Sequence, residues 1–167
     1  MKRIFLLWVV LMTALIINPY VHAQEQKATK AKKMKKPTLI VFVCEHGSAK
    51  SVVAAAHFNR LANERNLNLR AVSRGTNPDQ ELPAKTVEGL RADGIDVTGV
   101  KPGKLARSDV AGAARVVTFC KLPEAYANLA PVHNWEDVPP MSEDYGRFRD
   151  IVVERIKRLL DELGKSK

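Results

Sequence analysis

Cysteine is scarce in this chain, which contains only Cys44 and Cys120. Two cysteines cannot build the disulfide framework of a small secreted scaffold, so the fold has to rest on a hydrophobic core. The sequence shows no internal repeat, which excludes solenoids and propellers. Three histidines, His46, His57 and His133, have no paired spacing with cysteines or acids. We therefore expect neither a metal site nor a cofactor.

The sequence also lacks an apolar run long enough to span a membrane. The longest run, residues 4–17, falls short of the about 20 residues that a membrane-spanning helix needs. Lys2 and Arg3 precede this run, and small residues, Val21 and Ala23, lie before a cleavage position. The pattern predicts a signal peptide over residues 1–23, and hence a periplasmic or secreted protein. The alternative is an uncleaved anchor.

Acidic residues are nearly absent from residues 24–36, which contain one acidic residue, Glu25, and six lysines. With few apolar residues, this segment is predicted to be a disordered linker. Of the net charge of +9, Lys2 and Arg3 contribute two and residues 24–36 contribute five, which leaves +2 on residues 37–167. Most of the basic charge therefore lies before residue 37, and it does not indicate a nucleic-acid-binding face on the folded part. The linker is either a solvated spacer or a segment attracted to an anionic membrane surface.

Residues 37–167 are numerous enough for one well-packed domain, and their pattern alternates between strands and helices. Short buried strands are predicted at residues 38–43, 69–73, 115–119 and 132–135. Helices are predicted at residues 51–66, 83–92 and 109–114, with a helical turn in 122–129 and a last helix that Ser142 or Asp144 caps. This alternation predicts an α/β fold with a parallel sheet, in which ligands bind beyond the strand ends. Cys44, Arg74 and Cys120 all follow strand ends.

Cys44 stands between a buried strand and the start of a helix. Backbone N–H groups and the helix dipole point at such a position, which lowers the pKa of a thiol and favours anion binding. The alternative is a buried structural cysteine, since free cysteine is often buried.

The residues after Cys44 resemble a known phosphate-binding loop. Five residues separate Cys44 from Lys50-Ser51, which resembles the C-x5-R-[ST] loop of low-molecular-weight protein tyrosine phosphatases and the related thioredoxin-coupled arsenate reductases. Further stretches similar to motifs of this family are Val72-Ser73-Arg74-Gly75-Thr76, Gly94-Ile95-Asp96-Val97 and Val116-Val117-Thr118-Phe119-Cys120. The resemblance implies the phosphotyrosine phosphatase I-like fold, a four-stranded parallel sheet of order 2-1-3-4 flanked by helices.

The resemblance also implies roles for individual residues. Cys44 would be the thiolate nucleophile that attacks a phosphate ester or arsenate, Ser51 would hold the thiolate, and Asp137 would protonate the leaving oxygen. The phosphate or arsenate oxyanion would be held by the loop residues Glu45, His46, Gly47, Ser48, Ala49 and Lys50.

Three departures from the family pattern weaken the expected catalysis. Lys50 replaces the arginine and loses its planar fork, which costs about 2–4 kcal/mol of transition-state binding if one preorganised donor is lost. Gly47 lies at or beside the position of the usual asparagine. Asp137 lies in Asp-Val-Pro-Pro instead of Asp-Pro, so the alternatives are a turn-forming aspartate there or Asp144 as the acid.

Cys120 separates two enzymatic hypotheses. We expect hydrolysis of a phosphate monoester, with phosphotyrosine as one candidate, through a phosphocysteine on Cys44. The first alternative is arsenate reduction, in which Cys44 and Cys120 cycle with a thiol-disulfide reductant; a third family cysteine is replaced by Ala127. The second alternative is a non-catalytic oxyanion-binding module. Cys120 could also be only a small buried residue, or oxidised with Cys44 in an oxidising compartment.

Overall fold

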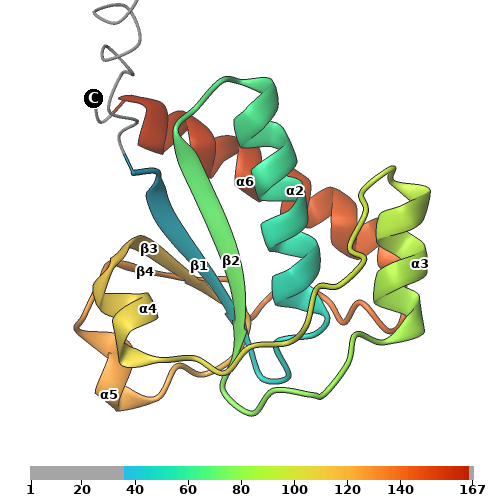
Figure 1. The fold of residues 1–167 in the computed structure, drawn as a ribbon, viewed down its shortest axis with the longest axis horizontal. Coiled ribbons are helices and arrows are strands. Elements are labelled where there is room, and N and C mark those ends of the chain that lie inside the picture. Colours follow the sequence, from blue (N-terminus) through green and yellow to red (C-terminus); the bar gives the residue numbers. More distant parts are fainter. Residues whose placement is uncertain (1–35, 166–167) are drawn as a thin grey trace, which may run out of the picture. The chain divides into compact units, whose positions relative to one another are not determined.

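The sheet has four parallel strands in the order β2-β1-β3-β4: β1 (Thr38–Cys44), β2 (Leu69–Gly75), β3 (Ala113–Thr118) and β4 (Val132–Asn134) (Figure 1). The computed structural model describes residues 36–165, which belong to one compact unit. The predicted fold class and strand order are confirmed. The predicted signal peptide, and all but the last residue of the predicted linker, lie outside the described residues.

Helices cover both faces of this sheet (Figure 1). One face carries α2 (Lys50–Glu64), α3 (Ala84–Ala92) and α6 (Tyr145–Lys165), and the other carries α4 (Arg107–Ala111) and α5 (Glu124–Ala127). Side chains alternate along β1, so Phe42 packs in the core below α2 and α6, while Val43 packs in the smaller core near α4. Within residues 36–165, no helix is long and apolar enough to cross a bilayer.

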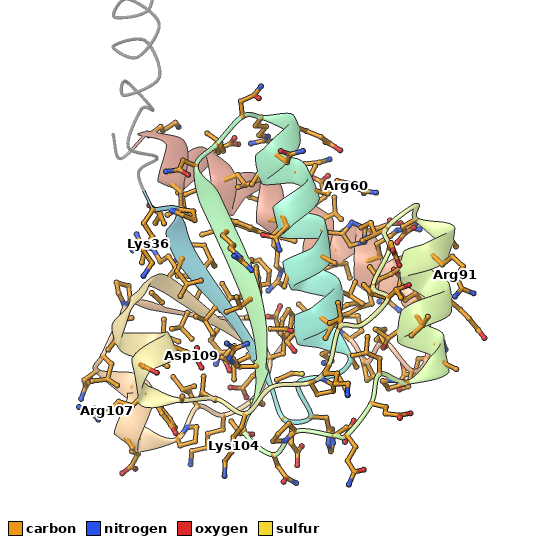
Figure 2. All side chains as sticks on the ribbon, viewed as in Figure 1. Lys36, Arg60, Arg91, Lys104, Arg107 and Asp109 are labelled. Atoms are coloured by element: carbon orange, nitrogen blue, oxygen red, sulfur yellow. The ribbon has the colours of Figure 1, made fainter. Side chains whose placement is uncertain are left out.

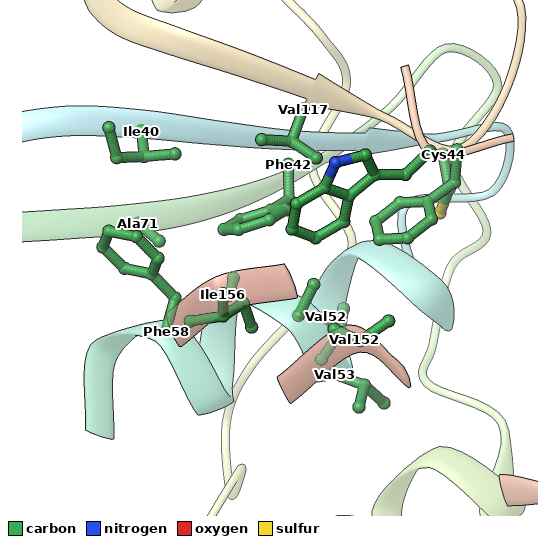
Figure 3. Packing of buried hydrophobic residues seen from close by; sticks show 14 of the residues in the cluster. Ile40, Phe42, Cys44, Val52, Val53, Phe58, Ala71, Val117, Val152 and Ile156 are labelled. Atoms are coloured by element: carbon green, nitrogen blue, oxygen red, sulfur yellow. The ribbon is translucent and has the colours of Figure 1, made fainter. Parts of the chain in front are cut away.

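Aromatic rings fill the larger core beside the end of β1. The ring of Phe42 lies 5.8 Å from that of Phe58 and 6.0 Å from that of Trp135, measured between centroids. Val152 and Ile156 of α6 pack on the same side, and Cys44 follows at the end of this strand (Figure 3). Each fully buried phenylalanine contributes about 1.5–3 kcal/mol. The position of Cys44 is thus fixed by a well-packed strand.

Two helix starts show how side chains set the boundaries. Asp144 caps α6, because its carboxylate accepts the N–H of Arg147 at 2.9 Å, so Asp144 and not Ser142 is the cap. The predicted helix over residues 109–114 is wrong in its bounds. Asp109 accepts the N–H of Ala106 at 3.0 Å, which starts α4 earlier, and α4 ends at Ala111.

The outer edge of β2 is covered by a side chain. Asn59 of α2 accepts the N–H of Ala71 at 2.7 Å and donates to the carbonyl of Ala71 at 3.0 Å. At the end of the same edge, Gly75 donates its N–H to Gly103 and accepts the N–H of Leu105, and both hydrogen bonds are 2.8 Å long. The amide of Asn59 therefore occupies the place of a neighbouring strand at Ala71.

A buried polar network joins α2 to α3 and α6. His57, whose side chain is fully buried, lies with Nε2 3.1 Å from the carboxylate of Asp93. Asp93 also accepts hydrogen bonds from the Tyr145 hydroxyl at 2.6 Å and from Arg149 at 2.8 Å. Burial and the neighbouring Arg60 lower the pKa of His57, so the imidazole is neutral in the folded protein at neutral pH.

This network predicts that the protein loses stability as the pH falls below about 6.5. The unfolded chain binds a proton on His57 near the ordinary pKa of 6.5, whereas the folded chain binds it only at lower pH. The unfolded state therefore carries more protons there, and the free energy of unfolding should fall by up to about 1.4 kcal/mol per pH unit. Urea denaturation between pH 7.5 and 5.5 measures this fall. It should persist in His133→Gln and shrink in His57→Gln; an equal slope in both variants would contradict the prediction.

Candidate active site

The loop between β1 and α2 wraps around the thiol of Cys44. The N–H of Gly47 donates to Cys44 Sγ at 3.2 Å, and Ser51 Oγ lies 3.1 Å from the same sulfur. Ser51 is fully buried and Cys44 is 6% exposed. A backbone N–H and a hydroxyl are donors that a thiolate accepts, so the loop can hold the negatively charged form of Cys44.

The shape of this loop depends on a close backbone contact between two glycines. Gly47 has a φ of +61°, in the left-handed region, and a Cβ there would lie 2.6 Å from the backbone N of Gly75. Likewise, a Cβ on Gly75 would lie 2.7 Å from the backbone N of Gly47. Only glycine fits at both positions, because the opposing atoms are backbone and cannot turn away.

Backbone hydrogen bonds tie the loop to the segment after β2. The carbonyls of Cys44, Glu45 and His46 accept N–H groups at 3.2, 2.8 and 3.0 Å, and the donors are Thr76, Asn77 and Asp79. With these carbonyls occupied, the loop is fixed before any ligand arrives, which is the preorganisation that oxyanion binding needs.

Asp79 supports two loop side chains and was not found from the sequence. Ser48 Oγ donates to its carboxylate at 2.5 Å, and His46 Nδ1 lies 3.2 Å from the other carboxylate oxygen. His46 and Ser48 therefore shape the loop through Asp79. The only sequence signal at Asp79 is an Asn-Pro-Asp turn, which does not distinguish a loop partner from an ordinary turn.

A pocket of about 380 Å³ opens in front of Cys44. It is lined by Cys44, Glu45, His46, Ala49, Lys50, Pro83, Lys85, Phe119, Cys120, Pro140, Met141 and Ser142. The structure thus brings Cys44, Lys50 and Cys120 to one site. Ser51 lies behind the sulfur, in the buried start of α2. No cluster of three or more potential metal ligands occurs among the residues that the structure describes.

Lys50 lies at the pocket wall and is held by the main chain opposite. Its ammonium donates to the carbonyl of Val138 at 3.0 Å. An ammonium has three N–H donors, so two remain for an anion in the pocket. The carbonyl fixes the position of the charge, but Lys50 lacks the planar double contact of an arginine.

Cys120 reaches the pocket from the neighbouring strand. β3 pairs with β1, and the N–H of Phe119 donates to Val43 O at 2.8 Å, which places the ends of the two strands side by side. Both cysteines are free thiols. The pKa of Cys120 is raised, mainly because the thiol is buried and further because of negative charge on Cys44, Glu136 and Glu45. A hydrogen bond with Thr118 lowers this pKa, but by less than the burial raises it. The Cys120 thiol is therefore protonated at neutral pH.

Two predicted charged residues lie outside the pocket lining. The carboxylate of Asp137 is exposed and forms a two-fold ion pair with Arg155, one of whose bonds is 2.8 Å long. The guanidinium of Arg155 lies 5.7 Å from the ring centroid of Trp135, and its hydrogen bonds lower the pKa of Asp137. Arg74, a residue of β2, pairs with Asp109 of α4 at 2.8 Å. Figure 2 shows Asp109 beside β2. Arg74 therefore braces the scaffold.

The fold and the pocket define a class of protein: a parallel α/β domain that presents a cysteine in the loop between an inner strand and a helix, at the carboxyl end of the sheet. The sequence model described as low molecular weight phosphotyrosine protein phosphatase matches residues 39–167. The chain belongs to the low molecular weight phosphotyrosine protein phosphatase family.

Solved structures show the same fold. YfkJ from Bacillus subtilis is 18% identical, with a TM-score of 0.70 over 80% of this chain and 99% of that chain. A thioredoxin-dependent arsenate reductase from Corynebacterium glutamicum is 18% identical, with a TM-score of 0.62 over 89% and 72% of the two chains. An arsenate reductase from Archaeoglobus fulgidus is 27% identical, with a TM-score of 0.59 over 73% and 98%. No curated protein matches the sequence.

Proposed function

We propose that the chain hydrolyses phosphate monoesters through a phosphocysteine on Cys44, with aryl phosphates such as phosphotyrosine as substrates. The observation that carries the proposal is the sulfur of Cys44, which meets the Gly47 N–H at 3.2 Å and Ser51 Oγ at 3.1 Å at the base of an open pocket. A nucleophile held by preorganised donors is what attack on phosphorus requires.

The proposed reaction has two steps. The thiolate of Cys44 attacks phosphorus and the P–O bond to the leaving group breaks. Asp137, once its carboxylate has left Arg155 and taken up a proton, gives that proton to the departing oxygen. Water then gives a proton to the Asp137 carboxylate and attacks the phosphocysteine, the S–P bond breaks, and phosphate and the Cys44 thiolate are released. Because Asp137 is paired with Arg155, this role requires its carboxylate to leave that ion pair. The pairing, and Lys50 in place of arginine, both argue for slow turnover.

The test is phosphate release from an aryl phosphate by the reduced protein, together with mass spectrometry of the acid-quenched enzyme. We expect slow release and a phosphate adduct on the peptide that contains Cys44. No release and no adduct would overturn the proposal. Phosphate binding without either would favour a non-catalytic oxyanion-binding module.

Substituting Lys50→Arg should raise kcat/KM for an aryl phosphate by about tenfold to hundredfold. An arginine can keep a contact to the carbonyl of Val138 and still offer a planar pair of N–H groups to two phosphate oxygens. Steady-state hydrolysis by both proteins measures the gain. Lys50→Met should lose activity, and an arginine variant no better than the methionine variant would contradict this role.

Arsenate reduction is the second candidate, because Cys44 and Cys120 line the same pocket and are both free thiols. The Cys44 thiolate would bond to arsenic with loss of water. The Cys120 thiol would then lose its proton and attack Cys44 Sγ. Oxidation of the two thiols to a disulfide gives two electrons to arsenic, which leaves as arsenite, and an external dithiol then reduces the disulfide back to two thiols. Loss of two thiols per arsenite formed would support this reaction. Reduction that survives in Cys120→Ala would exclude it.

We also propose that the protein is exported to the periplasm or secreted after cleavage of residues 1–23, and that the lysine-rich linker contacts anionic membrane surfaces. N-terminal sequencing of the mature protein should begin at Gln24. Binding to anionic vesicles should be lost when residues 24–36 are deleted, and retained binding would rule out this role of the linker.

A further inference from the structure

Lys85 is a second cation of the pocket, and no role in the proposed reaction uses it. It lies in the first turn of α3 and lines the pocket together with Cys44 and Lys50. Its ammonium donates to the carbonyl of Ser142 at 2.5 Å. Lys50 makes the corresponding bond to Val138. Two lysines from different helices thus place their charges on one loop that borders the pocket.

The two charges are fixed within a limited distance of one another. Their carbonyl partners are four residues apart in the chain, which span at most about 14 Å, and the two hydrogen bonds extend the limit for the ammonium groups to about 20 Å. Each ammonium has three donors and gives one to its carbonyl, so donors remain at both ends of this span. Because Lys50 and Lys85 line the same pocket, a ligand that fills it can contact both without displacing either from the loop.

The other charges at the mouth do not cancel this pair. Glu45 is the only acidic residue among those that line the pocket, and its carboxylate lies 4.0 Å from His46 Nε2. The same lining contains the apolar residues Pro83, Phe119, Pro140 and Met141. The pocket combines an anion loop, an apolar wall and a second cation.

We infer that Lys85 binds a second acidic group of the substrate, so that the preferred substrates are aryl phosphates that also carry a carboxylate. The phosphate lies in the loop at Cys44, the ring lies against Phe119 and Met141, and the carboxylate contacts Lys85. This inference rests on the proposed function for the phosphate end and extends it by naming the substrate class.

The test compares phenyl phosphate with 4-carboxyphenyl phosphate by calorimetry on the Cys44→Ser protein, in which turnover does not interfere. We expect the carboxylated ligand to bind about two- to fivefold tighter, as one partly exposed ion pair allows. Lys85→Met should remove this preference, Lys85→Arg should keep it, and Lys157→Met on α6 serves as the matched control that also keeps it. Equal affinities for the two ligands, or a preference that survives in Lys85→Met, would overturn the inference.

A second measurement needs no change at Lys85. Raising the salt concentration from 0.05 to about 1 M screens exposed charges and should shrink the preference of the same protein. A preference that is independent of salt would count against an ion pair. Binding and turnover also separate the two proposals. A Lys85-dependent preference without phosphate release by the wild type would refute hydrolysis alone, whereas release with no preference would refute the role of Lys85 alone.

Discussion

Cys44→Ser should lower phosphate release from an aryl phosphate by about four orders of magnitude or more. A serine hydroxyl is a far weaker nucleophile at neutral pH than a thiolate, although it fills nearly the same space beside Gly47 and Ser51. The loop geometry should therefore survive while the chemistry is lost. Stopped assays of inorganic phosphate at equal enzyme concentration measure the effect.

The companion variant Cys120→Ser separates the two enzymatic candidates. Hydrolysis uses only Cys44 as a nucleophile, so phosphate release should stay within about tenfold of the wild type, whereas arsenate reduction needs the second thiol and should stop. Equal rates for wild type and Cys44→Ser would show that any phosphate release comes from elsewhere. Unchanged circular dichroism and urea midpoints exclude unfolding as the cause.

Gly47→Ala should destabilise the protein by about 2–4 kcal/mol and lower kcat/KM by about a hundredfold. A Cβ at Gly47 meets the backbone of Gly75 at 2.6 Å, and the positive φ adds its own cost. Relief of the clash moves the loop off the end of β2, which displaces the N–H that Cys44 Sγ accepts. Urea denaturation and steady-state kinetics measure the two effects.

Gly99 provides a matched control for this substitution. Its φ is +76°, but no atom lies within 4 Å of the position that a Cβ would take. Gly99→Ala should therefore lower the free energy of unfolding only by the cost of a positive φ in alanine, about 1–2 kcal/mol, and should leave turnover intact. If Gly47→Ala matched Gly99→Ala in both stability and activity, the contact between the two strand-end loops would not matter.

The centre of the candidate site could be predicted because its information is local. Cys44 and Ser51 are seven residues apart, and the apolar run of β1 followed directly by a helix fixes where the loop must lie. The order of the strands followed from the family resemblance. Strands of a parallel sheet are buried on both faces, so they form short continuous apolar runs that can be predicted from the sequence.

The supports of the site could not be predicted because they depend on packing between distant segments. Lys50 binds a main-chain carbonyl of Val138, and a carbonyl has no sequence signal at all. The pairing of Asp137 with Arg155 depends on how α6 rotates against the sheet, so the residue expected to act in the pocket is instead held at α6. Asp79 supports the loop only because the segment after β2 folds back on it.

The amide of Asn59 has a consequence for how this domain behaves in a crowded solution. A strand at the border of a sheet invites a second molecule to pair with it, and such pairing is a route to aggregates. At Ala71 both polar groups of the border are already satisfied from within the same molecule. Asn59→Leu would unmask them while keeping α2 intact. The side chain that completes β2 therefore also protects the folded domain against self-association at that border.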